Sequence, residues 1–152
     1  VGAPHDDGGG GLQSGAVYLF ATSDNGATWA QTAKLKAADA AAYDMFGISV
    51  ATDGATVVAG AYGDGNAGSD GQNNPVGAVG AVYVFRASDG AQLAKLTASD
   101  AAASDYLVRI GRCRLLCLEA CNCYADEIVA HVAPHTRPQH DAVRAVHVGL
   151  SL

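Results

Sequence analysis

The sequence predicts an all-β fold, and three observations support this prediction. Glycine accounts for 19 of the 152 residues, and the apolar share of 49% is carried mainly by Ala and Val, which suits closely packed strands and tight turns. Short apolar runs are separated by turn sequences such as Asp53-Gly54 and Asp89-Gly90. Several of these runs also occur twice in the same order, so the chain is built from a repeated unit.

The repeat consists of three segments that recur at slightly different offsets. They are Gly15–Phe20 and Gly80–Phe85 (GAVYLF, GAVYVF), Ala33–Ala40 and Ala94–Ala101 (AKLKAADA, AKLTASDA), and more loosely Val1–Pro4 and Ala59–Tyr62 (VGAP, AGAY). The offsets are 65, 61 and 58 residues, respectively. Such drift is expected when loops are inserted between strands that stay fixed.

One complete unit extends from Tyr43 to Asp100 and contains four predicted strands: Phe46–Ala51, Thr56–Ala61, Ala81–Phe85 and Gln92–Leu96. A two-residue hairpin at Asp53-Gly54 joins the first two, and a long loop over 63–79 precedes the third, which is apolar throughout and predicted to be buried on both faces. Four short antiparallel strands repeated at about sixty residues are typical of a β-propeller blade. The sequence therefore predicts about two blades: a partial blade over 1–42, a full blade over 43–100 and the start of a third over 101–106.

The same segments resemble a known family. Tyr43–Val50 resembles the FG part of an FG-GAP repeat, and Val1–Pro4 matches its GAP part, so that 1–106 is similar to the repeats that form the N-terminal β-propeller of integrin α subunits. The resemblance implies a non-catalytic adhesion or ligand-binding module, extracellular or at the cell surface, that binds a protein or carbohydrate through its blade loops. Blade faces need neighbours, so further blades or self-association are expected. The alternative is a structural repeat within a larger secreted or surface enzyme.

The resemblance raises the question of whether the chain binds calcium. Many members of the family hold Ca²⁺ in an acidic loop between the first two strands of a blade, but here that connection is only Thr52–Ala55, too short to surround an ion. The remaining calcium candidates lie after the second strand: Asp6, Asp7, Asp64, Asn66 and Asp70. The alternative is that these side chains are ordinary solvated turn residues.

Other functional classes find little support in the sequence. The net charge of −6 argues against a nucleic-acid ligand, and no apolar run is long enough to cross a bilayer. No catalytic motif stands in a recognisable frame. Tyr18 and Tyr83 occupy equivalent strand positions, which favours a packing role, and Trp29, aligned with Leu93, is predicted to lie in the core or between blades.

The tail over 107–152 differs sharply from the repeats and is predicted to be irregular or partly helical. It contains five of the six Arg, all four Cys and four of the five His, but no Lys. We interpret it as a segment unrelated to the repeats. One hypothesis is that it is a native tail, and another is that it forms a small zinc-binding element. The zinc candidates are Cys113, Cys117, Cys121 and Cys123, with His131, His135, His140 and His147 nearby, although Pro134 and Pro138 would break a helix that aligned the histidines.

A third hypothesis is that the tail is an out-of-frame translation. A permitted choice of codons for Leu107–Arg114, read one base later, gives Trp-Phe-Gly-Ser-Val-Ala-Val-Asp. This restores the FG strand that the repeat requires after Tyr106, and it explains the change in Arg, Cys and His usage. The coding DNA across this junction decides between the hypotheses.

Overall fold

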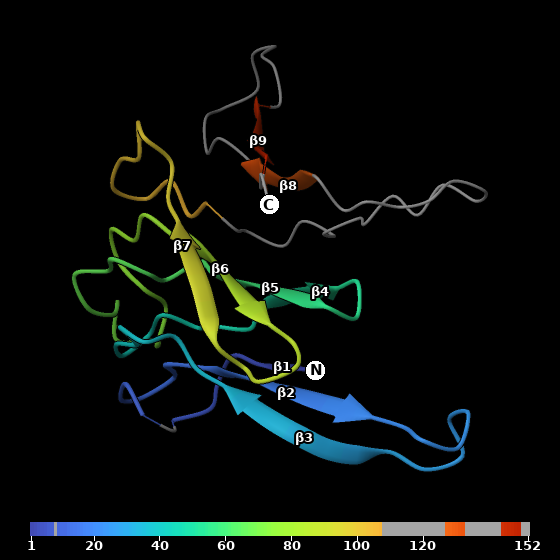
Figure 1. Cartoon of the computed structure of the whole chain (residues 1–152). Coiled ribbons are helices and arrows are strands. Elements are labelled where there is room, and N and C mark those ends of the chain that lie inside the picture. Colours follow the sequence, from blue (N-terminus) through green and yellow to red (C-terminus); the bar gives the residue numbers. More distant parts are fainter. Residues whose placement is uncertain (8, 108–126, 133–143, 150–152) are drawn as a thin grey trace.

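A computed structural model describes residues 1–7, 9–107, 127–132 and 144–149 of the chain. The described residues form nine strands and no helix, and the strands pair into three antiparallel sheets (Figure 1). The all-β prediction is confirmed. No helix in this part of the chain has the length and hydrophobicity needed to span a bilayer.

The first sheet contains β1 (Gly2–Ala3), β2 (Ala16–Ala21) and β3 (Ala30–Leu35) in that order. The register of β2 against β3 shifts between Leu19 and Phe20. The second sheet contains four strands in chain order: β4 (Ser49–Thr52), β5 (Thr56–Ala61), β6 (Ala81–Arg86) and β7 (Gln92–Leu96). These are the sheets expected of a partial and a complete propeller blade.

The central strand β6 is buried from Ala81 to Phe85, as its unbroken apolar run predicts. Its neighbour β5 and the outer strand β7 also have the predicted bounds. The connection between β4 and β5 is one residue longer than the predicted two-residue turn. It comprises Asp53–Ala55. One Asp53 carboxylate oxygen accepts hydrogen bonds from the backbone N–H groups of Ala55 and Thr56, at 2.9 and 2.7 Å, and so closes this longer loop.

The predicted first strand of the second sheet begins too early. Phe46 does not belong to β4 but forms an isolated parallel bridge to Gly15, the residue just before β2, and its N–H donates to the Ser14 carbonyl at 3.1 Å. This pairing, here called the seam, leaves no room for a side chain at Gly15, where a Cβ atom would lie 2.1 Å from the Phe46 carbonyl oxygen. Phe46 therefore joins the two sheets instead of extending one of them.

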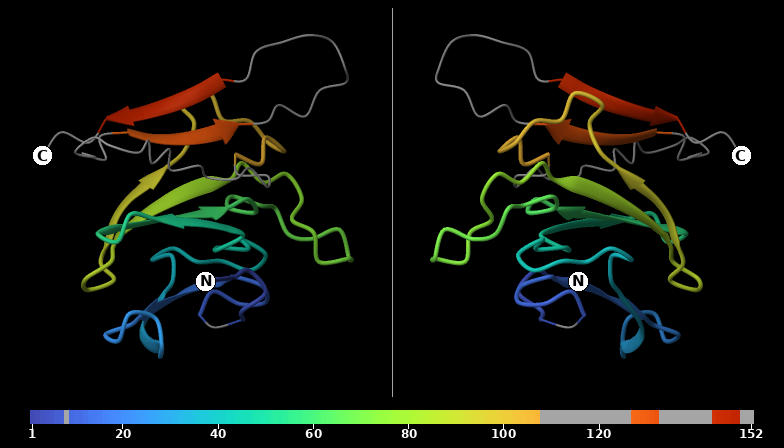
Figure 2. Two further views of the ribbon diagram at one scale, coloured as in Figure 1. Left: turned by 90° about the vertical axis from the view of Figure 1, so that its right-hand side faces the viewer. Right: turned by 90° about the vertical axis from the view of Figure 1, so that its left-hand side faces the viewer.

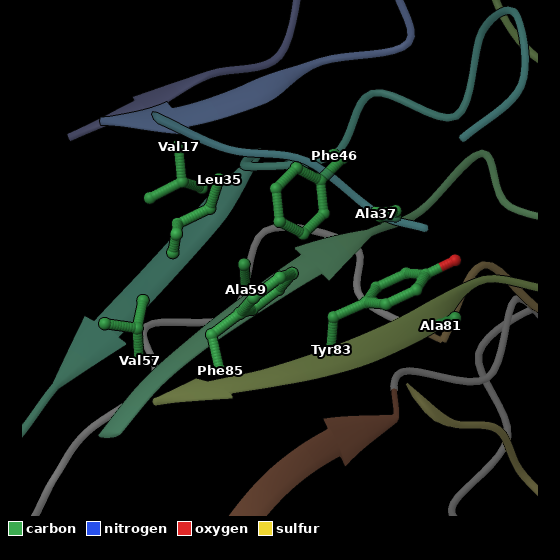
Figure 3. Close-up of a cluster of buried hydrophobic side chains, with 10 residues drawn as sticks. Val17, Leu35, Ala37, Phe46, Val57, Ala59, Ala81, Tyr83 and Phe85 are labelled. Atoms are coloured by element: carbon green, nitrogen blue, oxygen red, sulfur yellow. The ribbon is translucent and has the colours of Figure 1, made fainter. Parts of the chain in front are cut away.

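The hydrophobic core lies between the two sheets (Figure 3). Val17, Leu35 and Ala37 come from the first sheet and the segment after it, and the inward face of β5 and β6 supplies most of the remainder. The Phe46 ring packs edge-on against Tyr83, with centroids 5.5 Å apart, and 5.6 Å from Phe85. Each sheet thus covers one apolar face of its neighbour, as stacked repeats do.

Trp29 does not lie in this core, and its predicted alignment with Leu93 was wrong. The strand registers pair Phe20 with Gln31 and Phe85 with Gln92, which makes Gln31 and Gln92 equivalent. Trp29 therefore corresponds to Gly90 and not to Leu93, and 62% of its surface is exposed. The hairpin before it, which is longer than its counterpart in the second sheet, shifted the sequence alignment.

The described start of the third repeat folds like the start of the second. Asp105 accepts the Ala102 N–H at 2.7 Å, as Asp44 accepts that of Ala41 at 2.7 Å. The Leu107 N–H donates to the Val79 carbonyl at 2.9 Å, so Leu107 occupies the position that Phe46 has in the seam. The segment up to Leu107 therefore follows the same path as the segment up to Phe46.

The described part of the tail is a pair of strands, β8 (Glu127–Val132) and β9 (Arg144–Gly149), which are antiparallel to each other. No helix occurs in these two segments. The four candidate zinc-binding cysteines, and His135 and His140, lie outside the described residues. The boundary after Tyr106 and the out-of-frame origin of the tail remain predictions.

Candidate functional site

The topology separates the loops of the two sheets into two groups at opposite ends (Figures 1 and 2). Because neighbouring strands are antiparallel, the connections 4–15 and 62–80 lie at the same end as the linkers 36–48 and 97–107. We call this the long-loop end. The short hairpins after β2, β4 and β6 lie at the other end. Long loops on a rigid scaffold are the usual place for ligand binding.

The long-loop end of the first sheet is held by Asp6, Tyr18 and Lys34. The Tyr18 hydroxyl donates to one Asp6 carboxylate oxygen at 2.7 Å. Lys34 Nζ donates to both Asp6 oxygens, at 2.9 and 2.8 Å, and lies 5.1 Å from the centroid of the Tyr18 ring. The hydrogen bond from Lys34 to Asp6 is the main reason why the pKa of Lys34 is raised.

The second sheet repeats this arrangement with Asp64, Tyr83 and Lys95. Lys95 Nζ donates to Asp64 at 2.8 Å and lies 5.3 Å from the Tyr83 ring centroid, and the Tyr83 hydroxyl lies 3.0 Å from the same Asp64 oxygen. We call each set an Asp-Tyr-Lys cluster. Its recurrence at equivalent strand positions shows that it is part of the construction of the repeat.

A further carboxylate, Asp39, joins the second cluster from the linker between the sheets. It accepts hydrogen bonds from Lys95 Nζ at 2.6 Å and from the Tyr83 hydroxyl at 2.9 Å. Burial by itself would raise the pKa of Asp39, but these bonds outweigh burial and leave the pKa below its usual value. Burial and the adjacent Asp64 raise the pKa of Tyr83, so its hydroxyl is a donor at physiological pH. Asp39 therefore ties the first sheet to the second through charge-assisted hydrogen bonds.

Asp44, just ahead of the seam, is the most deeply buried carboxylate of the described residues, with 2% of its surface exposed. It accepts the Ala41 N–H at 2.7 Å, and the Asn66 amide group lies 3.3 Å from its other oxygen. Burial raises its pKa to about 6, the charges of Asp64 and Asp39 add to this effect, and that of Lys95 opposes it. Asp44 is therefore the carboxyl here whose ionisation opposes folding.

We expect Asp44 to make stability fall as the pH rises towards neutrality. Its folded pKa of about 6 lies above the ordinary value of 3.8, so between these values the folded chain retains a proton that the unfolded chain has lost. The contribution is complete below the ordinary value and disappears as the pH rises through about 6. Between about pH 4 and about pH 7, the free energy of urea unfolding of the original chain should fall relative to that of Asp44→Asn by an amount on the order of 1–3 kcal/mol. Equal pH profiles for both proteins would contradict this assignment.

The calcium candidates are not all held in one place. Asp6 and Asp64 belong to the Asp-Tyr-Lys clusters, and the Asn66 amide donates to the Ala42 and Gly63 carbonyls at 3.0 and 2.8 Å. Asp7 accepts the Gln13 N–H at 2.8 Å, and Asp70 accepts from Gln72 and Asn74 within its own turn. In the part of the chain that the structure describes, no group of three or more His, Cys, Asp or Glu side chains is arranged to hold a metal ion.

We propose that Asp6 and Asp64 serve as structural anions paired with lysine, and that calcium is not needed for folding. Millimolar calcium chloride is then expected to leave the thermal midpoint unchanged within about 1 °C, compared with an EDTA-treated sample. Sodium chloride of equal ionic strength serves as the control for screening. A calcium-specific rise that Asp70→Asn or Asp7→Asn removes would show instead that the long loops bind the ion.

A shallow groove of about 450 Å³ runs beside β1 and β4, where the two sheets meet. Its lining residues have uncharged side chains: Val1, Gly2, Pro4, Gly47, Ile48, Val50, Ala51 and Thr52. Because no charged or aromatic side chain lines it, we place the candidate ligand site at the long-loop end and not in this groove.

Sequence reasoning identified Asp6 and Asp64 but missed the partners that explain them. Lys34 and Lys95 stand in the recurring AKL segment, Tyr18 and Tyr83 in the recurring GAVY segment, and Asp39 in the recurring AADA segment. Polar residues that recur at fixed strand positions were the signal for a shared cluster. The sequence did not show that one linker aspartate reaches into the next sheet.

The antiparallel sheets, joined by a seam and packed face to face, define a β-propeller-type module. A family profile described as the FG-GAP repeat matches residues 29–85. This segment, which runs from just before β3 to near the end of β6, is therefore an FG-GAP repeat. Comparisons with curated proteins and with solved structures gave no match.

Proposed function

We propose that this chain is a non-catalytic, extracellular adhesion or ligand-binding module whose long-loop end contacts a protein or carbohydrate. The family of the matched repeat supports this proposal, because its members are generally binding modules. The observation that carries it is the asymmetry of the two ends: short turns close one end, whereas the other presents the 62–80 loop over a rigid base.

The tip of that loop is suited to polar recognition. Gly71, Gln72, Asn73 and Asn74 are all exposed, and Asp70 fixes their turn by accepting the Gln72 and Asn74 N–H groups at 2.7 and 3.2 Å. Below the tip, Tyr106 donates its hydroxyl to the Pro75 carbonyl at 3.1 Å. Amide groups held in a fixed turn can bind the hydroxyls of a glycan or the backbone of a protein with little loss of entropy.

The proposal is tested by replacing residues 69–75 with a Gly-Ser segment of equal length and screening both proteins on arrays of glycans and of purified extracellular proteins. The replacement should abolish any binding seen with the original chain while leaving its circular dichroism unchanged. The control replaces 24–28, the aspartate-capped turn at the opposite end, and should bind normally. If only the replacement of 24–28 abolishes binding, the ligand site lies at the short-hairpin end instead.

The same observations would fit a purely structural repeat within a larger secreted or surface protein. The hydrogen bonds of Asp6, Asp39 and Asp64 favour this structural role. These side chains bind partners within and between the sheets. A structural role predicts that neither loop replacement alters binding on either array.

A further inference from the structure

The second sheet holds the first through four side chains on one face. The Gln92 side-chain oxygen accepts the Ala38 N–H at 2.9 Å, while Tyr83 and Lys95 bind Asp39. Phe85 is 1% exposed beneath Val17 and Leu35 in the shared core. We call this set of Tyr83, Phe85, Gln92 and Lys95 the acceptor face, and residues Leu35–Asp39 the donor segment.

The first sheet carries an identical acceptor face. Strand registers place Tyr18 opposite Lys34 and Phe20 opposite Gln31, as Tyr83 lies opposite Lys95 and Phe85 opposite Gln92. All four residue types are therefore the same in both sheets.

This second acceptor face is exposed where its counterpart is buried. Phe20 is 44% exposed, whereas its counterpart Phe85 is 1% exposed. Trp29, 62% exposed, lies at the hairpin end of the same sheet. Apolar and aromatic side chains presented in this way mark an interaction surface.

The chain also carries a second donor segment. Leu96–Asp100 (LTASD) corresponds to Leu35–Asp39 (LKAAD), with Ser99 in the place of Ala38 and Asp100 in the place of Asp39. The linker that follows each sheet thus carries an aspartate four residues after the last residue of the outer strand. Leu96 and Ala98 are half-buried, whereas their counterparts Leu35 and Ala37 are 3% and 6% exposed beneath the second sheet.

We propose that the exposed acceptor face binds the donor segment of a second copy of this chain, which goes beyond the ligand-binding function proposed above. The Ser99 N–H then donates to Gln31, and Asp100 accepts from Tyr18 and Lys34, as Ala38 and Asp39 do within one chain. Lys34 already pairs with Asp6, and Lys95 shows that a lysine in this position binds two carboxylates at once. The contact joins two different surfaces, so copies associate head to tail into rings or open chains.

The first measurement is sedimentation velocity of the full chain over a range of micromolar concentrations. We expect species larger than the monomer that grow with concentration, and Phe20→Asp should weaken their association at least about tenfold. Leu93→Asp is the matched control, because Leu93 is 50% exposed but lies outside the acceptor face, and it should associate normally. If the chain stays monomeric at all these concentrations, the proposal is overturned. The exposed acceptor face would then be a surface for another blade of the same polypeptide.

A mixing experiment tests the head-to-tail geometry. Phe20→Asp keeps an intact donor segment, and Asp100→Lys keeps an intact acceptor face, so each variant alone should be monomeric. Mixed together, they should form a 1:1 dimer that grows no further. Failure to form this dimer, with both variants folded by circular dichroism, would overturn the proposed pairing.

Discussion

Replacing Gly15 by alanine is expected to break the seam between the two sheets. The new Cβ atom would lie 2.1 Å from the Phe46 carbonyl oxygen and 2.4 Å from its nitrogen, and the backbone φ of +88° is unfavourable for any side chain. Both contacts are with backbone atoms, so the sheets must separate to relieve them. We expect a loss of more than about 3 kcal/mol in urea unfolding, and loss of hydrogen-exchange protection at Met45 and Phe46, whose N–H groups donate across the seam.

Gly26→Ala is the matched control for this substitution. Gly26 has a φ of +92°, but nothing lies within 4 Å of the place its Cβ would occupy. It should therefore cost only the conformational penalty of about 1 kcal/mol. Similar losses in the two variants would show that the close approach at Gly15 contributes little to stability.

Phe46→Ala should be the most damaging core substitution. Its ring is completely buried, touches the aromatic rings of Tyr83 and Phe85, and fills the space where the two sheets meet. Loss of a buried phenylalanine typically costs about 3–5 kcal/mol, which is a large part of the stability of a small domain. Thermal unfolding followed by circular dichroism should show a much lower midpoint or no cooperative transition.

Phe20→Ala provides the comparison for the same chemical change at a half-exposed position. In dilute solution, where copies do not associate, its cost should be below about 1.5 kcal/mol. If the two variants lose equal stability, Phe46 does not hold the sheets together as described.

The sequence predicted the sheets well because their signals are local. The alternation and turns of Thr56–Ala61 and Gln92–Leu96 define strands without reference to the rest of the chain. Phe46 was placed in its own strand for the same reason, since it continues an apolar pattern. Its actual partner, Gly15, lies 31 positions earlier along the chain, and a contact of that kind leaves no periodic mark in either segment.

The candidate site was predictable in position but not in its internal bonding. The location of Asp6 and Asp64 in loops after the second strand follows from the order of the segments. Whether such carboxylates face solvent, an ion or a lysine depends on which side chains of β3 and β7 reach them. Lys34 and Lys95 reach them from the outer strands, 28 and 31 residues away in sequence.

The seam also gives a physical meaning to the limits of the family match. The matched segment begins at Trp29 and ends at Phe85, and each limit lies beside the outer hairpin of a sheet. A unit cut at these points contains Phe46 and the donor segment, whereas their partners Gly15, Gln92 and Lys95 lie outside it. Because β3 corresponds to β7, the outer strand of each such unit completes the sheet of the unit before it, and every junction is shared between two units.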